Sequence, residues 1–315
     1  MEQNKASKKP NKLLSAIEPY IWLAPSVILM VVMIIVPIYT VFQISFSEVG
    51  RTGKIKGFNG IQNYLEIFEE PAFWTTLSNT LIWTVVVVGV STVIGFILAM
   101  VLNQEFKGRK IVRAVVIFPW ATALIIQSVI WKYIINADYG SLNVMLRQWG
   151  LIDKFVNWTA TAGSMFAWEC WVGIFVTFPF VTFCVLSGLQ SIDTSLYEAA
   201  DVDGANVWQK FWHVTLPGIS PTTFFLLQAG AMAGLLTYDL AVLIIPDAWG
   251  SPGGVDSMGL TLIRLVYYLI TNSSTADANG VSYMVSCACV ISWMLFIVTG
   301  TISMIMFRLR EKSLK

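Results

Sequence analysis

The most specific spacing of polar residues in this chain lies at residues 195–217, between two long apolar segments. Ser195 stands three residues before Glu198, the spacing of a capping box that starts a helix. The two alanines after Glu198 predict a small, closely packing helix face. Gly204 is placed to end that helix, because glycine adopts a left-handed conformation without steric cost. The chemistry that this pattern supports is hydrogen bonding that shapes a helix within a loop. A second short helix is expected over residues 206–213.

Residues of the types that catalyse reactions or bind metals are sparse. The sequence lacks the Gly-x-x-x-x-Gly-Lys-Ser/Thr pattern, so the chain does not cradle and hydrolyse ATP by that route. It holds one histidine, His213, and no cluster of His, Cys and carboxylates at metal-ligand spacing. The four cysteines lie in apolar segments, where we expect small core residues: Cys170, Cys184, Cys287 and Cys289. We therefore expect no catalytic and no metal site, and an intramembrane enzyme is disfavoured.

The segments that must position the polar stretch have the composition of a membrane protein. Of the 315 residues 56% are hydrophobic and 12% are charged, whereas soluble domains contain about 25% charged residues. Six runs lack Asp, Glu, Lys and Arg, at 19–47, 71–104, 114–131, 170–192, 211–238 and 278–307. Since roughly 20 residues cross a bilayer, we expect an all-α membrane protein with six transmembrane helices, near residues 18–46, 76–102, 111–136, 162–190, 217–244 and 281–307.

Basic residues predict the orientation. Thirteen of the 20 lysines and arginines fall in the two terminal tails and in the loops after the second and fourth expected helices. The positive-inside rule places these segments in the cytoplasm. The predicted organisation is a basic tail at 1–18, a transmembrane domain at 19–307 and a second tail at 308–315. The transmembrane domain contains a cytoplasmic loop at 191–216. Pro37 predicts a kink in the first helix, and short outer helices are expected at 63–70 and 258–270.

The polar stretch resembles the cytoplasmic loop of the permease subunits of bacterial ABC importers. The motif of that family has Glu-Ala-Ala, Asp-Gly-Ala, a Phe and Leu-Pro, and the matching residues here are Glu198, Ala199, Ala200, Asp203, Gly204, Ala205, Phe211, Leu216 and Pro217. Family members often have Pro just before this helix, where this chain has Asp193 and Thr194. The start of the first helix, with Pro25 and Pro37, is similar to the first permease of maltose and glycerol-3-phosphate systems.

This resemblance implies a type I ABC importer transmembrane domain in a bacterial plasma membrane. The implied partners are a second homologous permease, two ATPase subunits and an extracytoplasmic solute-binding protein, with no nucleic acid. ATP and Mg would be bound by the ATPase, so this chain would need no cofactor of its own. The helix at 195–202 would dock into the ATPase as a coupling helix and move as a rigid lever. Glu198 and Asp203 would fix the loop or pair with basic groups of the ATPase.

The substrate is expected to be uncharged. Ion-coupled carriers bury an ionisable residue near the membrane midplane, and the expected helix centres contain none. A sugar needs aromatic faces and neutral hydrogen-bonding groups, and the helices that flank the loop offer one such face each. These candidates for the substrate pathway are Gly173, Thr177 and Phe180, then Gly230, Gly234 and Thr237, with Gln127, Gln228 and Tyr238 as weaker ones. Helix packing through small residues is the equal alternative for the glycines.

Two further alternatives remain open at this point. The chain could be a channel or a carrier that works without ATP, although the loop motif and the missing midplane charge speak against it. An ABC permease could also carry a non-sugar solute, such as a polyol or glycerol-3-phosphate. The sequence favours an ABC permease for a sugar or an oligosaccharide.

Overall fold

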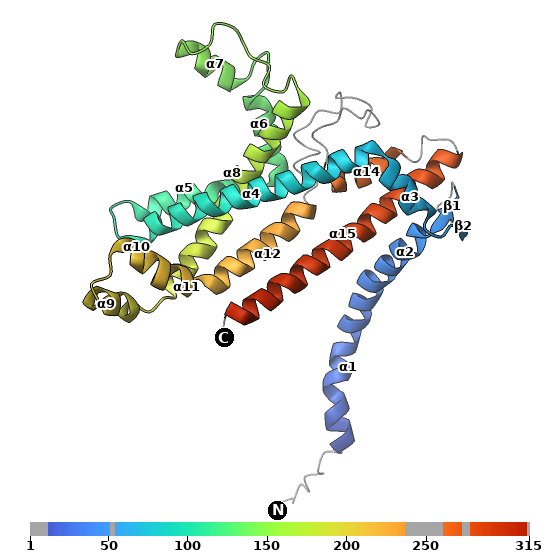
Figure 1. Cartoon of the computed structure of the whole chain (residues 1–315), viewed down its shortest axis with the longest axis horizontal. Helices are drawn as coiled ribbons and strands as arrows, with labels where there is room; N and C mark the ends of the chain where they lie inside the picture. Colours follow the sequence, from blue (N-terminus) through green and yellow to red (C-terminus); the bar gives the residue numbers. More distant parts are fainter. Residues whose placement is uncertain (1–11, 51–53, 237–260, 273–277, 314–315) are drawn as a thin grey trace, which may run out of the picture.

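A computed structural model describes residues 12–50, 54–236, 261–272 and 278–313. In chain order its elements are α1 (Lys12–Met30), η1 (Val31–Ile35), α2 (Val36–Ser45), β1 (Ser47–Val49), β2 (Ile55–Phe58), α3 (Gln62–Glu69), α4 (Pro71–Asn103), α5 (Arg109–Ala121), α6 (Leu124–Ile134), α7 (Ser141–Gln148), α8 (Ala162–Gln190), α9 (Thr194–Val202), α10 (Val207–Lys210), η2 (Phe211–Thr215), α11 (Leu216–Gly218), α12 (Ser220–Leu236), α14 (Leu262–Asn272) and α15 (Ala278–Ser313). Figure 1 shows α4, α8, α12 and α15 as neighbours in one bundle.

The described helices agree with the expected membrane protein. Four are long and apolar enough to cross a bilayer, at Pro19–Ser45, Pro71–Asn103, Gly163–Gln190 and Met284–Glu311. Two bent pairs, Arg109–Ala121 with Leu124–Ile134 and Val207–Gly218 with Ser220–Leu236, raise the number to six if each pair is one span. The predominantly helical architecture is therefore confirmed, while the count of six and the cytoplasmic termini stay predictions.

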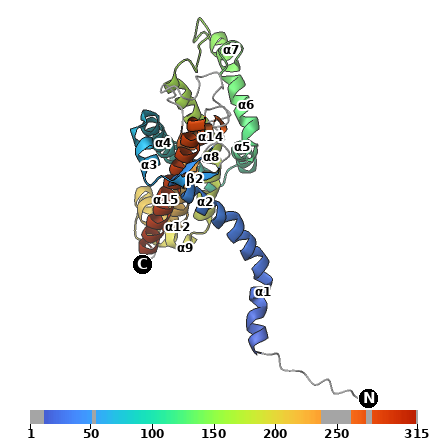
Figure 2. The ribbon, with the colours of Figure 1, turned by 90° about the vertical axis from the view of Figure 1, so that its right-hand side faces the viewer.

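The first span leaves the bundle. Its apolar stretch has no buried residues in the most hydrophobic window, and Figure 2 shows α1 running away from the other helices. At its other end α2 returns to the bundle, where the ring of Phe42 lies 4.8 Å from that of Trp293 on α15. Near Pro37, where we expected a kink, the helix contains a π-helical turn, η1, which ends at Ile35, two residues before this proline.

The segment expected as the third span consists of two helices, α5 and α6, which corrects the single helix expected over residues 111–136. The axes of α5 and α6 meet at 95°, because Thr122 and Ala123 have extended backbone conformations. Gln127 stabilises the break: its Nε2 donates to the carbonyl of Thr122 at 3.0 Å and to that of Pro119. A proline alone predicts a kink, but here a side-chain amide replaces the backbone partners that the break removes.

The segments that we expected as outer loops contain more structure than the sequence indicated. Strands β1 and β2 form an antiparallel hairpin within a stretch that we expected as a glycine-rich loop. The short helix expected from Asn63 to Glu70 is present as α3. Of the helix expected at 258–270, the part from residue 261 on is described and forms α14. Residues 258–260 lie outside the described part of the chain.

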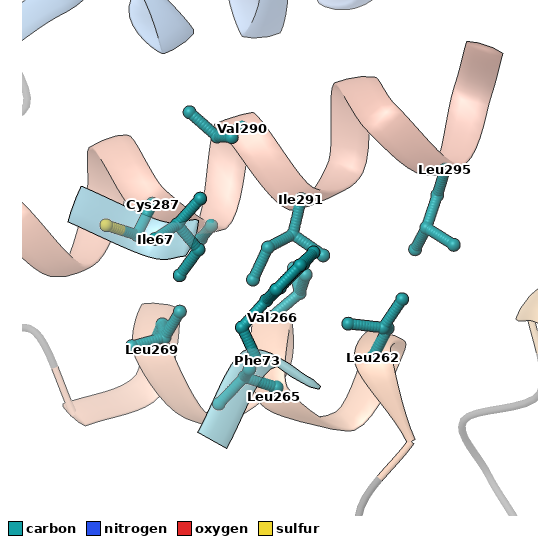
Figure 3. Close-up of a cluster of buried hydrophobic side chains, with 11 residues drawn as sticks. Ile67, Phe73, Leu262, Leu265, Val266, Leu269, Cys287, Val290, Ile291 and Leu295 are labelled. Carbon is teal, nitrogen blue, oxygen red and sulfur yellow. The ribbon is translucent and has the colours of Figure 1, made fainter. Parts of the chain in front are cut away.

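Buried clusters of apolar side chains hold the bundle together. At one end, Ile67, Phe73, Val266 and Ile291 join α3, α4, α14 and α15 in one buried cluster, drawn in Figure 3. At the other end a second cluster joins α4, α8 and α12. There α4 and α8 approach so closely that a Cβ on Gly95 would lie 2.7 Å from Cγ1 of Val181. The position of α8, which carries the polar loop, is therefore set by α4.

Asn143 organises the lobe around α7, which we expected to be an outer loop with turns. This side chain is fully buried. Its Nδ2 donates to the carbonyls of Asn136, Ala137 and Val156, and its Oδ1 accepts from the Val156 N–H and from Nε1 of Trp158. One amide thus supplies the hydrogen bonds that regular secondary structure would otherwise supply.

Replacing Asn143 with leucine is expected to open this lobe and to leave the bundle intact. The change removes the partner of the Val156 N–H and of Trp158 Nε1, both in part-buried hydrogen bonds, and each lost bond costs about 0.5–1.5 kcal/mol. Hydrogen–deuterium exchange should become faster over residues 136–161 and stay unchanged in α4 and α15. The control is Asn157→Leu, which removes an exposed side chain of the same lobe that bonds only locally to Thr159. Unchanged exchange in the Asn143 variant would contradict the assignment.

Candidate functional site in the loop between α8 and α12

Helix α9 carries the Glu-Ala-Ala motif and begins at a different cap from the one expected. Its N-cap is Asp193, whose Oδ1 accepts from the N–H of Ser195 at 2.9 Å. The predicted capping box of Ser195 with Glu198 is therefore wrong, because Asp193 already occupies the capping position. Hydrogen bonds from the backbone and the side chain of Ser195 hold the pKa of Asp193 below its usual value. The carboxylate is thus the favoured form at the positive end of the helix.

The predicted stop of α9 at Gly204 is confirmed. Gly204 has φ of +72°, in the left-handed region. Its N–H donates to the carbonyl of Asp201 at 3.1 Å, and the N–H of Ala205 donates to the carbonyl of Ala200 at 2.9 Å. These two bonds are those of a Schellman motif, which satisfies carbonyls at a helix end. The chain consequently reverses direction within two residues of the helix.

The second helix of the loop folds back onto the first. Asn206 caps α10 in a capping box with Gln209, with hydrogen bonds of 2.9 and 2.8 Å. An ion pair joins Asp201 of α9 to Lys210 at the end of α10. The hydroxyls of Tyr197 and Thr215 lie 3.0 Å apart, which joins α9 to η2. These contacts make the loop one compact body, although their polar groups are largely exposed.

An aromatic contact fixes this body to the bundle. The ring of Phe211, which follows α10, lies 5.7 Å from the ring of Phe96 on α4 in an edge-to-face arrangement. The end of α4 is capped next to this contact, because Arg109 Nε donates to the carbonyl of Leu102 at 2.6 Å and Arg113 donates to the same oxygen at 3.3 Å. A displacement of the loop therefore acts on α4 and α8 together.

The motif residues lie at the surface of this body, as docking onto another protein requires. Glu198, Ala199, Asp203 and Gly204 are exposed, while Ala200 and Ala205 are half-buried. Three large apolar side chains beside them are also exposed, which the sequence analysis missed: Val202 at 89%, Val207 at 79% and Trp208 at 72%. The sequence did contain a signal for them, because large apolar residues within a polar loop indicate a surface that contacts another molecule.

The glycines expected along the substrate pathway lie against α4. A Cβ on Gly230 would lie 2.9 Å from Val88, and one on Gly234 would lie 2.7 Å from Thr84. A Cβ on Gly173 would lie 3.0 Å from the ring of Trp83. This is the close helix packing that was the alternative for the two glycines of α12. That these glycines contact the substrate stays a prediction, and none of their described neighbours supports it.

The remaining pathway candidates differ in their surroundings. Thr177 and Phe180 are half-buried on α8, and the ring of Phe180 stacks on that of Trp120, with centroids 5.8 Å apart. Gln127 is buried at the break between α5 and α6. Gln228 donates from Nε2 to Ser303 Oγ at 2.7 Å and so joins α12 to α15. Two more candidates, Thr237 and Tyr238, lie outside the described residues.

Comparisons with known proteins agree with this architecture. The family model of the binding-protein-dependent transport system inner membrane component matches residues 91–314. The trehalose/maltose transport system permease protein MalF of Thermococcus litoralis is 32% identical over 262 residues, which are 83% of this chain and 87% of that protein. A probable ABC transporter permease protein of Brucella suis is 38% identical over 203 residues, covering 64% of this chain and 70% of that protein.

Further similarity comes from another relative and from solved structures. The arabinooligosaccharides transport system permease protein AraP of Bacillus subtilis is 32% identical over 258 residues, covering 79% of this chain and 77% of that protein. A chain in the crystal structure of a bacterial alginate ABC transporter, in complex with a periplasmic protein that holds an alginate pentasaccharide, superposes with a TM-score of 0.76. That pair is 21% identical and covers 94% of this chain and 96% of the other, so it shows the shared fold.

Proposed function

Because this chain belongs to the family of inner membrane components of binding-protein-dependent transport systems, and is thus a permease subunit of an ABC importer, we propose that it forms part of the translocation pathway for a sugar. We also propose that the chain is coupled to an ATPase, and the single observation that supports this coupling is the structure of the loop between α8 and α12. Its motif residues are exposed on a compact helical body that is fixed to two membrane helices. A carrier that works without ATP has no use for such a body, and family membership favours the ATP-driven alternative.

The loop acts as a lever between an ATPase and the membrane helices in this proposal. Glu198 and Asp203 lie on its outer face and meet basic groups of the ATPase, which binds ATP and Mg. Val202, Val207 and Trp208 enter an apolar groove of that subunit. Since the Schellman turn at Gly204 and the contact of Phe211 with Phe96 hold the loop to the bundle, closure of the ATPase dimer tilts α8 and α4. The pathway then switches from inward-open to outward-open.

The partners include a second permease, two ATPase subunits and an extracytoplasmic binding protein. The first span supports the second permease, because an apolar helix without buried residues is a surface for another membrane protein. Both termini and the loop lie in the cytoplasm of a bacterial cell, with six spans in total. The outer lobe around α7, at the end of the bundle opposite α9 in Figure 1, faces the binding protein.

A sugar is favoured as the substrate by the relatives and by the chemistry of the helices. Relatives from Thermococcus and Bacillus are named for trehalose and maltose and for arabinooligosaccharides. In this chain, aromatic rings and neutral polar groups, such as Phe180 and Thr177, stand on the helix that leads to the loop. Polyols and glycerol-3-phosphate are the second candidate. Uptake of radiolabelled maltose, trehalose and arabinotriose by cells that express the whole system separates the candidates, with glycerol-3-phosphate as the competing solute.

Replacing Trp208 with alanine is expected to weaken the association with the ATPase by about tenfold or more, since an exposed tryptophan that becomes buried is a typical hot spot. The measurement is the amount of ATPase subunit that co-purifies with the chain in mild detergent. Trp149→Ala is the matched control, because this tryptophan is similarly exposed, at 66%, on the outer lobe. Equal loss in both variants, or no loss in the first, would refute the apolar contact.

A further inference from the structure

A groove of about 870 Å³ lies between α4, α5 and α8. Nine of the ten described residues that line it are apolar, and the tenth is Lys110 in the first turn of α5. The wall on α5 includes Ile111, Val115 and Phe118, which are all exposed. Their spacing by four and three positions places them on one face of the helix. The groove therefore offers a long apolar surface with a positive charge at one end.

This lining does not suit a sugar. A buried hydroxyl without a hydrogen-bonding partner costs free energy, and among the described residues of the groove only Lys110 has a polar side chain. The groove also lies on another face of α8 than the expected sugar pathway. Phe175 lines the groove and is two positions from both Gly173 and Thr177, which is about 200° around a helix.

The groove extends through about one leaflet of the bilayer. Pro119 lines it and follows Lys110 by nine residues, which is about 14 Å along a helix. Half of the roughly 30 Å hydrocarbon core is about 15 Å. The lining thus starts next to the loop that joins α4 to α5 and ends at the bend before α6. An acyl chain of a lipid in that leaflet spans the same depth.

The end of the groove at this loop is basic. Lys107, Arg109, Lys110 and Arg113 lie within seven residues, and Glu105 is the one acid from residue 71 to residue 131 of the sequence. Arg109 and Arg113 donate to a carbonyl at the end of α4. Lys107 and Lys110 are exposed and form no ion pair within the described part of the chain. Their two charges can therefore hold an anion at this end of the groove.

We propose that the groove binds an anionic phospholipid, with one acyl chain along α5 and the phosphate at Lys110. Basic pockets between membrane helices on the cytoplasmic side bind anionic lipid headgroups, and the basic residues of this loop favour its placement in the cytoplasm. Lys107 adds a second charge near the headgroup. The inference goes beyond the proposed function, because it depends neither on the sugar nor on the ATPase.

A lipid fits this groove better than a helix of the second permease that we propose. Contacts between membrane helices are enriched in small residues that let the backbones approach, whereas Phe118, Phe175 and Phe178 line this groove. The flexible chain of a lipid adapts to such an uneven surface, and its charged headgroup complements the lysines. The bound lipid would contact α4 and α8, the helices that hold the loop with the Glu-Ala-Ala motif.

The test measures lipid binding by native mass spectrometry on the full chain, purified with its partners in mild detergent. The probes are palmitoyl-oleoyl phosphatidylglycerol, which is anionic, and palmitoyl-oleoyl phosphatidylcholine, which has no net charge. The unchanged protein should bind phosphatidylglycerol more tightly. Lys110→Gln should weaken that binding about fivefold, the effect of one lysine near an anionic lipid surface, and leave phosphatidylcholine unaffected. Ala114→Phe should weaken both lipids, because Ala114 lines the groove and a larger side chain takes the place of the acyl chain.

Two control variants separate charge and volume from position. Arg308→Gln is the control for charge, because Arg308 is exposed near the end of α15 and does not line the groove. Val112→Phe is the control for volume, since Val112 lies on α5 outside the lining. Both should bind the two lipids as the unchanged protein does. If Ala114→Phe does not assemble, Ala114→Leu adds a smaller side chain and carries the same expectation.

Four outcomes would overturn the proposal. Equal affinity of the unchanged protein for the two lipids, or unaltered binding by Lys110→Gln, would remove the headgroup site. Unaltered binding by the Ala114 variants would remove the role of the groove. Displacement of the lipid by an equal concentration of inorganic phosphate would indicate a site for free phosphate instead. Loss of the second permease from the Ala114 variants, with no lipid bound to the unchanged protein, would assign the groove to that subunit.

Discussion

Gly95→Leu is expected to prevent the bundle from folding. A Cβ at this position would lie 2.7 Å from Cγ1 of Val181 and 3.0 Å from the backbone nitrogen of Thr182. The side chain of Val181 can change rotamer, but the backbone of α8 can only move away. The contact between α4 and α8 would then open. Even Gly95→Ala should cost about 1–3 kcal/mol by overpacking. The measurement is the yield of monodisperse protein in detergent and its midpoint of thermal unfolding.

Gly89→Leu is the control on the same helix. No atom lies within 4 Å of a Cβ at Gly89, which is exposed, so leucine there should leave both the yield and the midpoint unchanged. Unchanged yield and midpoint in both leucine variants would mean that α4 and α8 do not depend on close approach at Gly95. A loss in both would point to membrane insertion rather than to packing.

Gly204→Val is expected to abolish transport while the bundle remains folded. A residue with a side chain in the left-handed region costs about 1–2 kcal/mol, and a β-branched residue fits it worst. Since no atom lies within 4 Å of a Cβ at Gly204, the penalty arises from the backbone alone. The turn should relax and take the exposed face of α9 out of register with the ATPase. Sugar import should fall by tenfold or more with an unchanged midpoint of thermal unfolding.

Gly204→Asn separates the backbone from the surface. Asparagine tolerates the left-handed conformation better than other residues with side chains, so this variant should retain most of the import if the turn is what matters. Loss of import in both variants would mean that the ATPase touches Gly204 itself. Full import by the valine variant would remove the role assigned to the Schellman turn.

The sequence predicted elements whose signals are local. The apolar run before the loop predicted α8 with the bounds Ala162–Gln190 that the structure has, because both of its ends coincide with changes in composition. Gly204 was predictable as a helix stop for the same reason. The start of α9 was not predictable in this way. Asp193 and Ser195 both have side chains that can cap a helix, and only the backbone conformation distinguishes them.

Features that depend on distant partners escaped prediction. Pro119 predicted at most a kink, and the full break of the third span requires Gln127 to reach back to the freed carbonyls. The stack of Trp120 on Phe180 joins residues that are 60 positions apart in the sequence. For the glycines of α12, helical spacing alone fitted a pathway and a packing surface equally well. Only the position of α4 shows which neighbours Gly230 and Gly234 have.

The first span affects how the transporter is made. It is synthesised before the other described spans, and its apolar stretch has no buried residues in its most hydrophobic window. A helix of this kind is stable in lipid before any later span exists, because its backbone hydrogen bonds are internal and its side chains are apolar. It is therefore ready to meet the second permease that we propose while the rest of the chain is still being synthesised. With such a partner, assembly of the complex would begin during translation, and the order of synthesis of the two permeases would influence its yield.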